Sequence, residues 1–318
     1  MPTYPGLSSD AFRHPLDLEA EQTLRSVPGF DVVTRKFIEF FYERPQMIHL
    51  MGNAIQVSPY QYSSLHQIFR ECVACLDVHP QPQLFVVQNP VANSYALGED
   101  NPYIVINSGL LDLLDPPELQ VAIAHELGHI KCGHSTLTQM AIWTMNAAAI
   151  VGEMTLGVGS FISNSLVVAF YEWRRKAELS ADRASLLATD DLSLVFKTMM
   201  KLAGGSQRYS HELNVAAFQR QSQAYQQLDQ DGLNAFYKVL FQTGDQGLML
   251  THPFPVERVS YLQEWADSAA YQALRSGYYT PSNAPPAAAS SGEPPEVVQL
   301  RQQIADLQAQ IDRHKKRS

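Results

Sequence analysis

The chain has 318 residues, of which 45% are hydrophobic and 17% are charged. This composition supplies enough apolar side chains for one large or two smaller globular domains, and it excludes a disordered chain, a collagen-like repeat and a small disulfide-stapled scaffold. The chain carries 23 Lys and Arg against 32 Asp and Glu, a net charge of −9, and four of the basic residues lie in the last six positions. The remainder is strongly acidic, so a nucleic-acid partner is not expected.

The first 80 residues predict a helical N-terminal arm. Residues 1–28 are mostly polar and are expected to pack onto the main domain, and helical periodicity follows at about 31–43 and 60–77. No signal peptide is recognisable, so we expect a cytoplasmic protein with reduced thiols. Cys72 and Cys75 form a C-x-x-C pair on the second of these helices. Buried thiols on one helix face are favoured there over a metal or redox pair.

After residue 80 the pattern changes from helical periodicity to short β-rich runs. Three short β-rich runs at 83–87, 94–96 and 103–106, separated by proline, glycine and asparagine, predict a small antiparallel sheet. From Pro117 to about Ser276 the pattern is almost wholly helical. The chain at 115–118 (Asp-Pro-Pro-Glu) is a helix opening, with a capping aspartate, an early proline and an acid in the first turn.

The pattern predicts one domain over 1–278, made of the arm (1–80) and a core (81–278), and the core contains the candidate site residues described below. Residues 279–295 are rich in Pro, Ala and Ser and are expected to be a flexible linker. The last segment, 296–318, predicts a short coiled-coil helix with a basic end. The apolar seam of this helix spans only two heptads, Val297 to Ile311. A helix this short needs a partner surface to be stable. A homo-oligomer formed through 297–311 is one interpretation.

The segment 135–171 bears on the cellular location. Its only charged residue is Glu153, yet hydroxyl, amide and glycine residues throughout make it too polar for a predicted membrane span. A buried helical hairpin is the favoured interpretation. Peripheral contact with a membrane surface is the alternative, and the sequence leaves both open.

The motif H-E-x-x-H at residues 125–129 carries the strongest chemical signal in the chain. Histidines four residues apart on a helix lie one turn above each other, so both imidazoles can face one ion. The glutamate between them can reach a water beside the metal without being a ligand. This arrangement is typical of zinc metalloproteases, in which two histidines bind zinc and the glutamate is the general base.

A hydrolytic zinc needs three protein ligands and one open position. Glu178 and Asp182 are four residues apart and share one face of a predicted helix. One carboxylate can therefore bind the metal while the other accepts an N–H from a ligating imidazole. The metzincin pattern would place its third histidine at position 135, which is Ser135 here. His134 is one residue short of that position, and it is interpreted as a non-ligand that lies either behind a metal ligand or at the surface.

Four motifs, in this order, resemble those of the zinc metallopeptidases that include the bacterial heat-shock protease HtpX and the CAAX prenyl proteases, a gluzincin family. The similarity runs from about Leu84 to Leu262. The motifs are an edge-strand region (93–96 and 103–111), the H-E-x-x-H helix (125–129), the E-x-x-x-D helix (178–182) and a late His252-Pro253 with Arg258.

The resemblance implies an α+β, mostly helical fold with a zincin-like core, in which the small antiparallel sheet packs on the active-site helices. It implies one Zn²⁺ per chain, held by His125, His129 and Glu178. Glu126 would be the general base, and His252 would be a second catalytic residue that donates to the oxyanion of the tetrahedral intermediate.

Two further roles follow from the same resemblance. Asp182 would support a ligating histidine, and Arg258 would brace the site. The peptide substrate would lie along Asn93, Ser94, Tyr95 and Ala96, by addition of a strand to the sheet.

The sequence therefore predicts a zinc-dependent endopeptidase that cleaves extended or unfolded polypeptide. Members of the HtpX and CAAX types have membrane-spanning helices that this sequence does not show clearly, so prenyl-protein processing is not carried over. Two alternatives stay open. One is a latent, zinc-bound chaperone or scaffold, and the other is a quality-control factor attached peripherally to a membrane.

Overall fold

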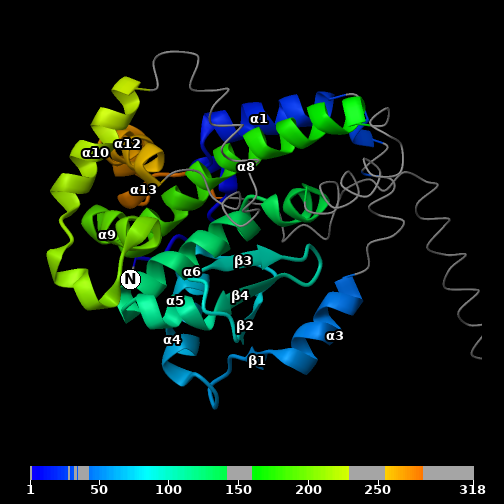
Figure 1. Ribbon diagram of the computed structural model, residues 1–318, viewed down its shortest axis with the longest axis horizontal. Helices are drawn as coiled ribbons and strands as arrows, with labels where there is room; N and C mark the ends of the chain where they lie inside the picture. Colours follow the sequence, from blue (N-terminus) through cyan, green and yellow to red (C-terminus); the bar gives the residue numbers. More distant parts are fainter. Residues whose placement is uncertain are drawn as a thin grey trace, which may run out of the picture. The chain divides into compact units, whose positions relative to one another are not determined.

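The computed structural model describes residues 2–27, 29–31, 34, 43–141, 160–228 and 255–281, all within one unit, Met1–Pro281 (Figure 1). Several predicted features therefore lie outside the described residues and stay predictions. They are His252, most of the helix at 31–43, the middle of 135–171, nearly all of the linker and the C-terminal helix.

A four-stranded sheet forms one layer of the fold. Its strands are β1 (Ile55–Gln56), β2 (Gln83–Val87), β3 (Ser94–Leu97) and β4 (Tyr103–Asn107), in the order β1-β2-β4-β3. The predicted sheet was wholly antiparallel, and this is wrong for one pairing: β2 runs parallel to β4, with Leu84 opposite Ile104. The reason is that the chain leaves β2 for the far edge, forms β3 there and returns antiparallel to it, so that β4 occupies the place beside β2.

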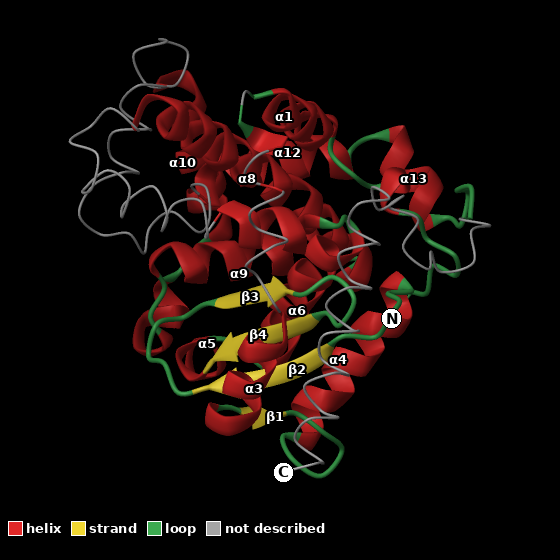
Figure 2. Cartoon of the chain, turned by 90° about the vertical axis from the view of Figure 1, so that its right-hand side faces the viewer, coloured by secondary structure: helices red, strands yellow, loops and turns green. Residues whose placement is uncertain are grey.

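Helices make up most of the rest of the described chain and cover the sheet (Figures 1 and 2). α6 packs on both α4 and α8, and α8 in turn packs on α1. The fold is α+β and mostly helical, as predicted. The helices are α1 (Pro15–Ser26), α3 (Glu43–Asn53), α4 (Ser63–Leu76), α5 (Ser108–Leu113), α6 (Pro116–Lys131), α8 (Ser160–Thr189), α9 (Leu192–Gly204), α10 (Val215–Leu228), α12 (Pro255–Ala266) and α13 (Ala269–Arg275), with short 3-10 turns at Ser9–Ala11 and Gln207–Glu212.

The helix α4 confirms the interpretation of the C-x-x-C pair. Cys72 and Cys75 are free thiols on its buried face, together with Leu65 and Phe69. Burial raises the pKa of the Cys75 thiol to about 12. Since the thiolate is the reactive form, these cysteines behave as small core residues.

The start of α6 is fixed by the residues that predicted it. Asp115 caps the helix, and its backbone N–H donates to the Glu118 carboxylate at 2.8 Å. Glu118 is almost wholly buried, and it is neutralised by Lys201 of α9, whose ammonium lies 2.6 Å away. This ion pair ties the first turn of the helix that carries H-E-x-x-H to α9.

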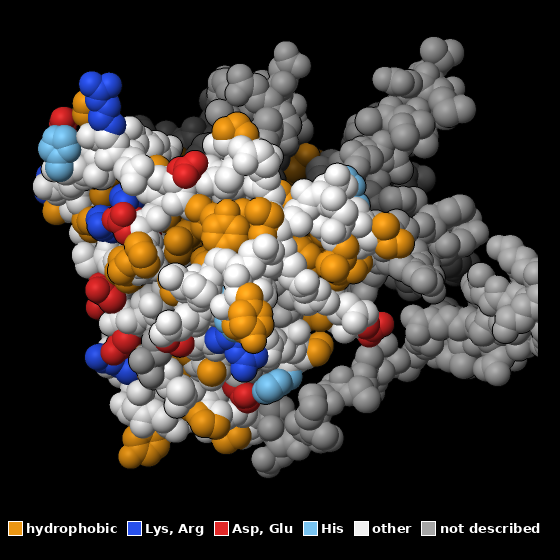
Figure 3. Space-filling model, turned by 90° about the horizontal axis from the view of Figure 1, so that it is seen from below, with side chains coloured by type: hydrophobic (Ala, Val, Ile, Leu, Met, Phe, Trp, Pro, Cys, Tyr) orange, Lys and Arg blue, Asp and Glu red, His pale blue; other side chains and the backbone are white. Residues whose placement is uncertain are grey.

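Most described side chains at the two ends of the segment 135–171 are buried or half-buried, and Val168, 41% exposed, is the exception among them. Leu137 and Met140 pack against Leu166 and Phe170 of α8, in a cluster that also takes in Leu24 of α1. Within the described part of the chain, no helix is long and apolar enough to cross a membrane. On the face shown in Figure 3, apolar side chains lie in several patches, and acidic and basic groups lie close to one another.

The N-terminal helix α1 begins with an unusual cap. His14 is buried, and its ring Nδ1 accepts the backbone N–H of Leu16 at 3.1 Å, which only an unprotonated nitrogen can do. Burial, followed by the positive charges of Arg183 and Lys176, lowers the pKa of His14 to about 4. α1 is therefore capped by a neutral histidine at neutral pH.

This cap predicts a pH-dependent stability. Because His14 binds fewer protons in the folded chain, its contribution is complete above pH 6.5 and is lost as the pH falls towards 4. Asparagine also caps helices and does not titrate. Between pH 6.5 and 4.5, wild type should lose about 1–2 kcal/mol more unfolding free energy than His14→Asn, after allowance for solvent screening.

The measurement is urea unfolding of both proteins at several pH values, with a metal chelator present throughout. His211→Asn, at an exposed histidine, is the control and should follow wild type. Parallel pH curves for wild type and His14→Asn would contradict the prediction.

Candidate active site

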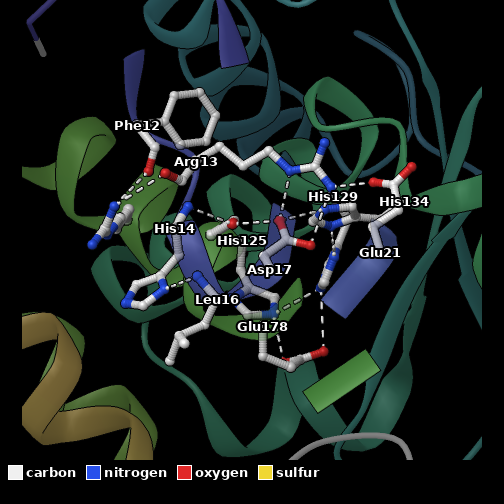
Figure 4. A network of polar contacts seen from close by, with 12 residues as sticks. Phe12, Arg13, His14, Leu16, Asp17, Glu21, His125, His129, His134 and Glu178 are labelled. Carbon is white, nitrogen blue, oxygen red and sulfur yellow. Dashed lines mark hydrogen bonds and ion pairs between the residues drawn. The ribbon is translucent and has the colours of Figure 1, made fainter. Parts of the chain in front are cut away.

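The helix α6 brings the two histidines of H-E-x-x-H to one point. His125 and His129 lie one turn apart, and their Nε2 atoms are 3.2 Å from each other. The carboxylate of Glu178, on α8, faces both rings: one oxygen is 3.1 Å from His125 Nε2 and the other is 3.3 Å from His129 Nε2. All three side chains are labelled in Figure 4.

This geometry fits a zinc ion. Ligand bonds of about 2.0 Å arranged tetrahedrally place neighbouring ligand atoms about 3.3 Å apart. The two Nε2 atoms are 3.2 Å apart, each faces one oxygen of Glu178 at 3.1 or 3.3 Å, and one ligand atom from each residue lies within 4.8 Å of the other two. Two imidazole nitrogens and one carboxylate form a donor set used by catalytic zinc. Among the residues that the structure describes, His125, His129 and Glu178 are the His, Cys, Asp or Glu side chains that lie close enough together to hold a metal ion.

A glycine allows α6 and α8, the helices that carry His129 and Glu178, to approach this closely. A Cβ atom added at Gly128 of α6 would lie 2.7 Å from Ala184 Cβ and 3.0 Å from Ala181 Cα, both on α8. Contacts this short cannot be tolerated, so any side chain at position 128 would separate the helices. The convergence of His129 and Glu178 depends on this contact.

We therefore expect Gly128→Ala to weaken metal binding although alanine favours a helix. Overpacking in a core typically costs about 1–3 kcal/mol, and the displacement of α8 should lower zinc affinity at least tenfold, as measured by competition with a chromophoric chelator. Gly52→Ala on α3 is the matched control, because nothing lies within 4 Å of its added Cβ. Equal zinc affinity for both variants would contradict the prediction.

A buried ion-pair network supports His125 from behind. Its Nδ1 lies 3.2 Å from a carboxylate oxygen of Asp182, and the Arg258 guanidinium contacts both oxygens of Asp182. Arg258 also lies 3.2 Å from Glu178. Burial acts to raise the pKa of Asp182, but Arg258 outweighs it and holds that pKa below its usual range. The pKa of His125 would be lowered by burial, but Glu178 and Asp182 raise it to about 9.

The glutamate of the motif is connected to the sheet. Glu126 is 3% exposed, and one of its carboxylate oxygens accepts the hydroxyl of Ser94 at 2.7 Å. Ser94 belongs to β3, the edge strand next to α6 in the described sheet (Figure 2). The strand and the motif therefore meet at one hydrogen bond.

The four residues expected along the substrate occupy different places. Ser94 alone among them contacts Glu126 in the contacts described. Asn93 accepts a backbone hydrogen bond from Asn107 at the end of the strand pair. Tyr95 packs with Phe85 on one side of the sheet, and Ala96 belongs to the main core.

Two residues close to the site, Asp17 and Arg174, carry no prediction from sequence. A third, His134, is predicted only as a non-ligand, either behind a metal ligand or at the surface. Its Nδ1 lies 2.9 Å from Nδ1 of His129, and its other ring nitrogen lies 3.0 Å from Asp17 of α1. No sequence signal connects Asp17 to a histidine 117 positions later. Arg174 lies one turn before Glu178 on α8. Burial lowers its pKa, opposed by the charges of Glu178 and Glu126.

The sequence is similar to known metallopeptidases. The model of peptidase family M48 matches residues 59–266. A plastoglobule-localized metallopeptidase 48 (chloroplastic) of Arabidopsis thaliana is 35% identical over 271 residues, which cover 84% of this chain and 76% of that protein. A protease HtpX homolog of Moorella thermoacetica is 26% identical over 71% of this chain and 79% of its own length.

A second HtpX homolog, from Methanosarcina mazei, is 25% identical over 71% of this chain and 80% of its own length. No solved structure matches the chain significantly. The family match covers more than half of the chain and includes the H-E-x-x-H helix and Glu178. The chain therefore belongs to peptidase family M48 and is a metallopeptidase.

Proposed function

We propose that this chain is a zinc endopeptidase whose single zinc ion is held by His125, His129 and Glu178. The observation that carries the proposal is the convergence of two Nε2 atoms and one carboxylate at mutual distances of 3.1–3.3 Å, with Glu126 beside them on the same helix. When bound, zinc would supply a Lewis acid that polarises the scissile carbonyl and makes a water molecule more acidic.

Proton transfer is the proposed task of Glu126. Its carboxylate would accept a proton from the attacking water and then deliver it to the nitrogen of the leaving amine. The hydroxyl of Ser94 donates to one of its oxygens, and the other oxygen would exchange the proton. Arg258 would hold Asp182 and Glu178 in place. The oxyanion role of His252 remains a proposal from the family resemblance.

The strand β3 supports a preference for extended substrates. In the described sheet it pairs with β4 on one side only, and its first residue contacts Glu126. A peptide that adds to its outer edge would present main-chain groups to β3 and its carbonyls towards the metal site. Only an extended segment has those groups available, so unfolded polypeptide is the proposed substrate class.

The test uses the full chain and a mixture of unstructured peptides, with products identified by mass spectrometry. We expect cleavage at internal bonds, loss of cleavage after zinc is removed with a chelator, and recovery with one equivalent of Zn²⁺. His125→Ala should neither retain zinc nor cleave. Stable binding of one zinc without any cleavage would overturn the enzyme proposal and favour the latent scaffold.

A further inference from the structure

The two proposed histidine ligands are supported in different ways. His125 has a carboxylate, Asp182, directly behind its Nδ1 at 3.2 Å. Behind His129 lies a second imidazole instead: His134 Nδ1 is 2.9 Å from His129 Nδ1. The other nitrogen of His134, Nε2, is 3.0 Å from the carboxylate of Asp17, so His129 reaches a carboxylate through one intervening residue (Figure 4).

The direction of these hydrogen bonds follows from the ligand role of His129. If its Nε2 binds a metal, the proton of the neutral ring must be on Nδ1. That N–H then donates to Nδ1 of His134, which leaves the proton of His134 on Nε2, facing the acceptor Asp17. One tautomer of each ring satisfies both hydrogen bonds. The hydrogen bonds therefore all run in one direction, from His129 through His134 to the carboxylate of Asp17.

Asp17 is built into the protein as a fixed anion. Its side chain is 0% exposed and accepts three further hydrogen bonds: two from Arg13 at 2.7 and 3.1 Å, and one from the Ser180 hydroxyl at 2.7 Å. Burial acts to raise the pKa of Asp17, but the bonds from His134 and Arg13 hold it well below its usual range. Asp17 therefore supplies a permanent negative charge at the end of the hydrogen-bonded series His129–His134–Asp17.

His134 is equally constrained. It is 1% exposed, and its ring packs nearly perpendicular to that of Trp173, with the two planes at 84°. A buried imidazole between two polar partners has one rotamer that satisfies both. It transmits the position of Asp17 to His129.

We propose that Asp17 and His134 are positioning residues for the metal ligand His129, so that the N-terminal helix α1 completes the metal site. This proposal rests on the metal site proposed above. Asp17 lies outside residues 59–266, the part of the chain that the M48 family model matches. The support therefore comes from a segment beyond that match.

A purely structural role is the competing explanation: the same bonds could serve only to anchor α1 on α8. The two explanations differ in what they predict for zinc. An anchor affects the free energy of unfolding, whereas a positioning chain affects the zinc affinity of protein that is still folded. Contacts behind metal ligands typically change metal affinity by about 10–100-fold.

The experiment measures the zinc affinity of the full chain by competition with a chromophoric chelator. We expect His134→Ala to weaken it about 10–100-fold. His134→Gln should stay within about threefold of wild type, because its amide oxygen can accept from His129 while its NH₂ donates to Asp17. Glu19→Gln is the control: Glu19 is an exposed carboxylate on α1, and it does not contact Asp17, Arg13 or His134 in the described contacts.

A second variant tests whether Asp17 acts on His129 through His134. Asp17→Asn should weaken zinc binding, and the double variant with His134→Ala should bind no more weakly than His134→Ala alone, since Asp17 acts through His134. Additive losses would overturn the proposal. A folded His134→Ala variant that binds zinc with wild-type affinity would also overturn it. If His134→Ala does not fold, wild-type zinc affinity in Asp17→Asn would overturn it instead.

These results are distinguishable from a failure of the proposed metal site. If wild type binds no zinc, or if His125→Ala binds it as tightly as wild type does, the metal site itself is wrong and the positioning role is overturned with it. If wild type binds one zinc and His125→Ala does not, the variants of His134 and Asp17 decide the positioning role alone.

Discussion

Glu126→Gln is expected to lower kcat for peptide hydrolysis by about 10²–10⁴-fold, the range that a general base contributes, while zinc affinity stays at the wild-type value. Glutamine has the shape of glutamate, and its amide oxygen can still accept the hydroxyl of Ser94, which lies 2.7 Å from the carboxylate. The amide cannot accept a proton from water at neutral pH. The variant therefore removes the base and preserves the site.

The assay is cleavage of the best peptide from the unstructured mixture, with zinc content measured on the same samples. Ser94→Ala should retain the base and lower kcat by a smaller factor, about 10–100-fold, because it removes one hydrogen bond to the Glu126 carboxylate. Glu71→Gln neutralises an exposed carboxylate on α4 and should be as active as wild type. If Glu126→Gln with full zinc content cleaves at the wild-type rate, Glu126 is not the base.

The parts of the site that depend on local spacing could be predicted from sequence. The helical period brings His125 and His129 to one face, and the Asp-Pro-Pro-Glu opening determines where that helix begins. Both features involve residues within a few positions of each other. The pairing of β2 with β4 is different, because it depends on which edge of the sheet the chain crosses to, and alternation of side chains does not encode that.

The neighbourhood of His134 illustrates a second limit. On a continuous helix, a residue five positions after His129 would point about 140° away from it. α6 ends first: Gly133 has a φ of +73°, a left-handed conformation that glycine adopts readily, and the chain turns there. This turn brings His134 back against His129. Its second partner comes from α1, which only the tertiary fold places nearby.

The second large effect is expected at Arg258. Its guanidinium is 7% exposed and lies against two buried carboxylates, Asp182 and Glu178. Removing one partner of a buried ion pair typically costs about 3–5 kcal/mol, because the remaining charge is left uncompensated. We therefore expect Arg258→Met to lose about that much free energy of unfolding in urea, with a chelator present so that bound zinc does not contribute.

Arg275→Met is the matched control. Arg275 also pairs with a carboxylate, Asp190, but its side chain is 50% exposed, and pairs of this kind typically contribute about 0–1 kcal/mol. Adding Asp182→Asn to Arg258→Met should recover part of the lost stability, because one of the two uncompensated charges is then removed. A loss at Arg258 no larger than that at Arg275 would mean that the buried carboxylates are compensated by other groups, and that Arg258 does not brace the site.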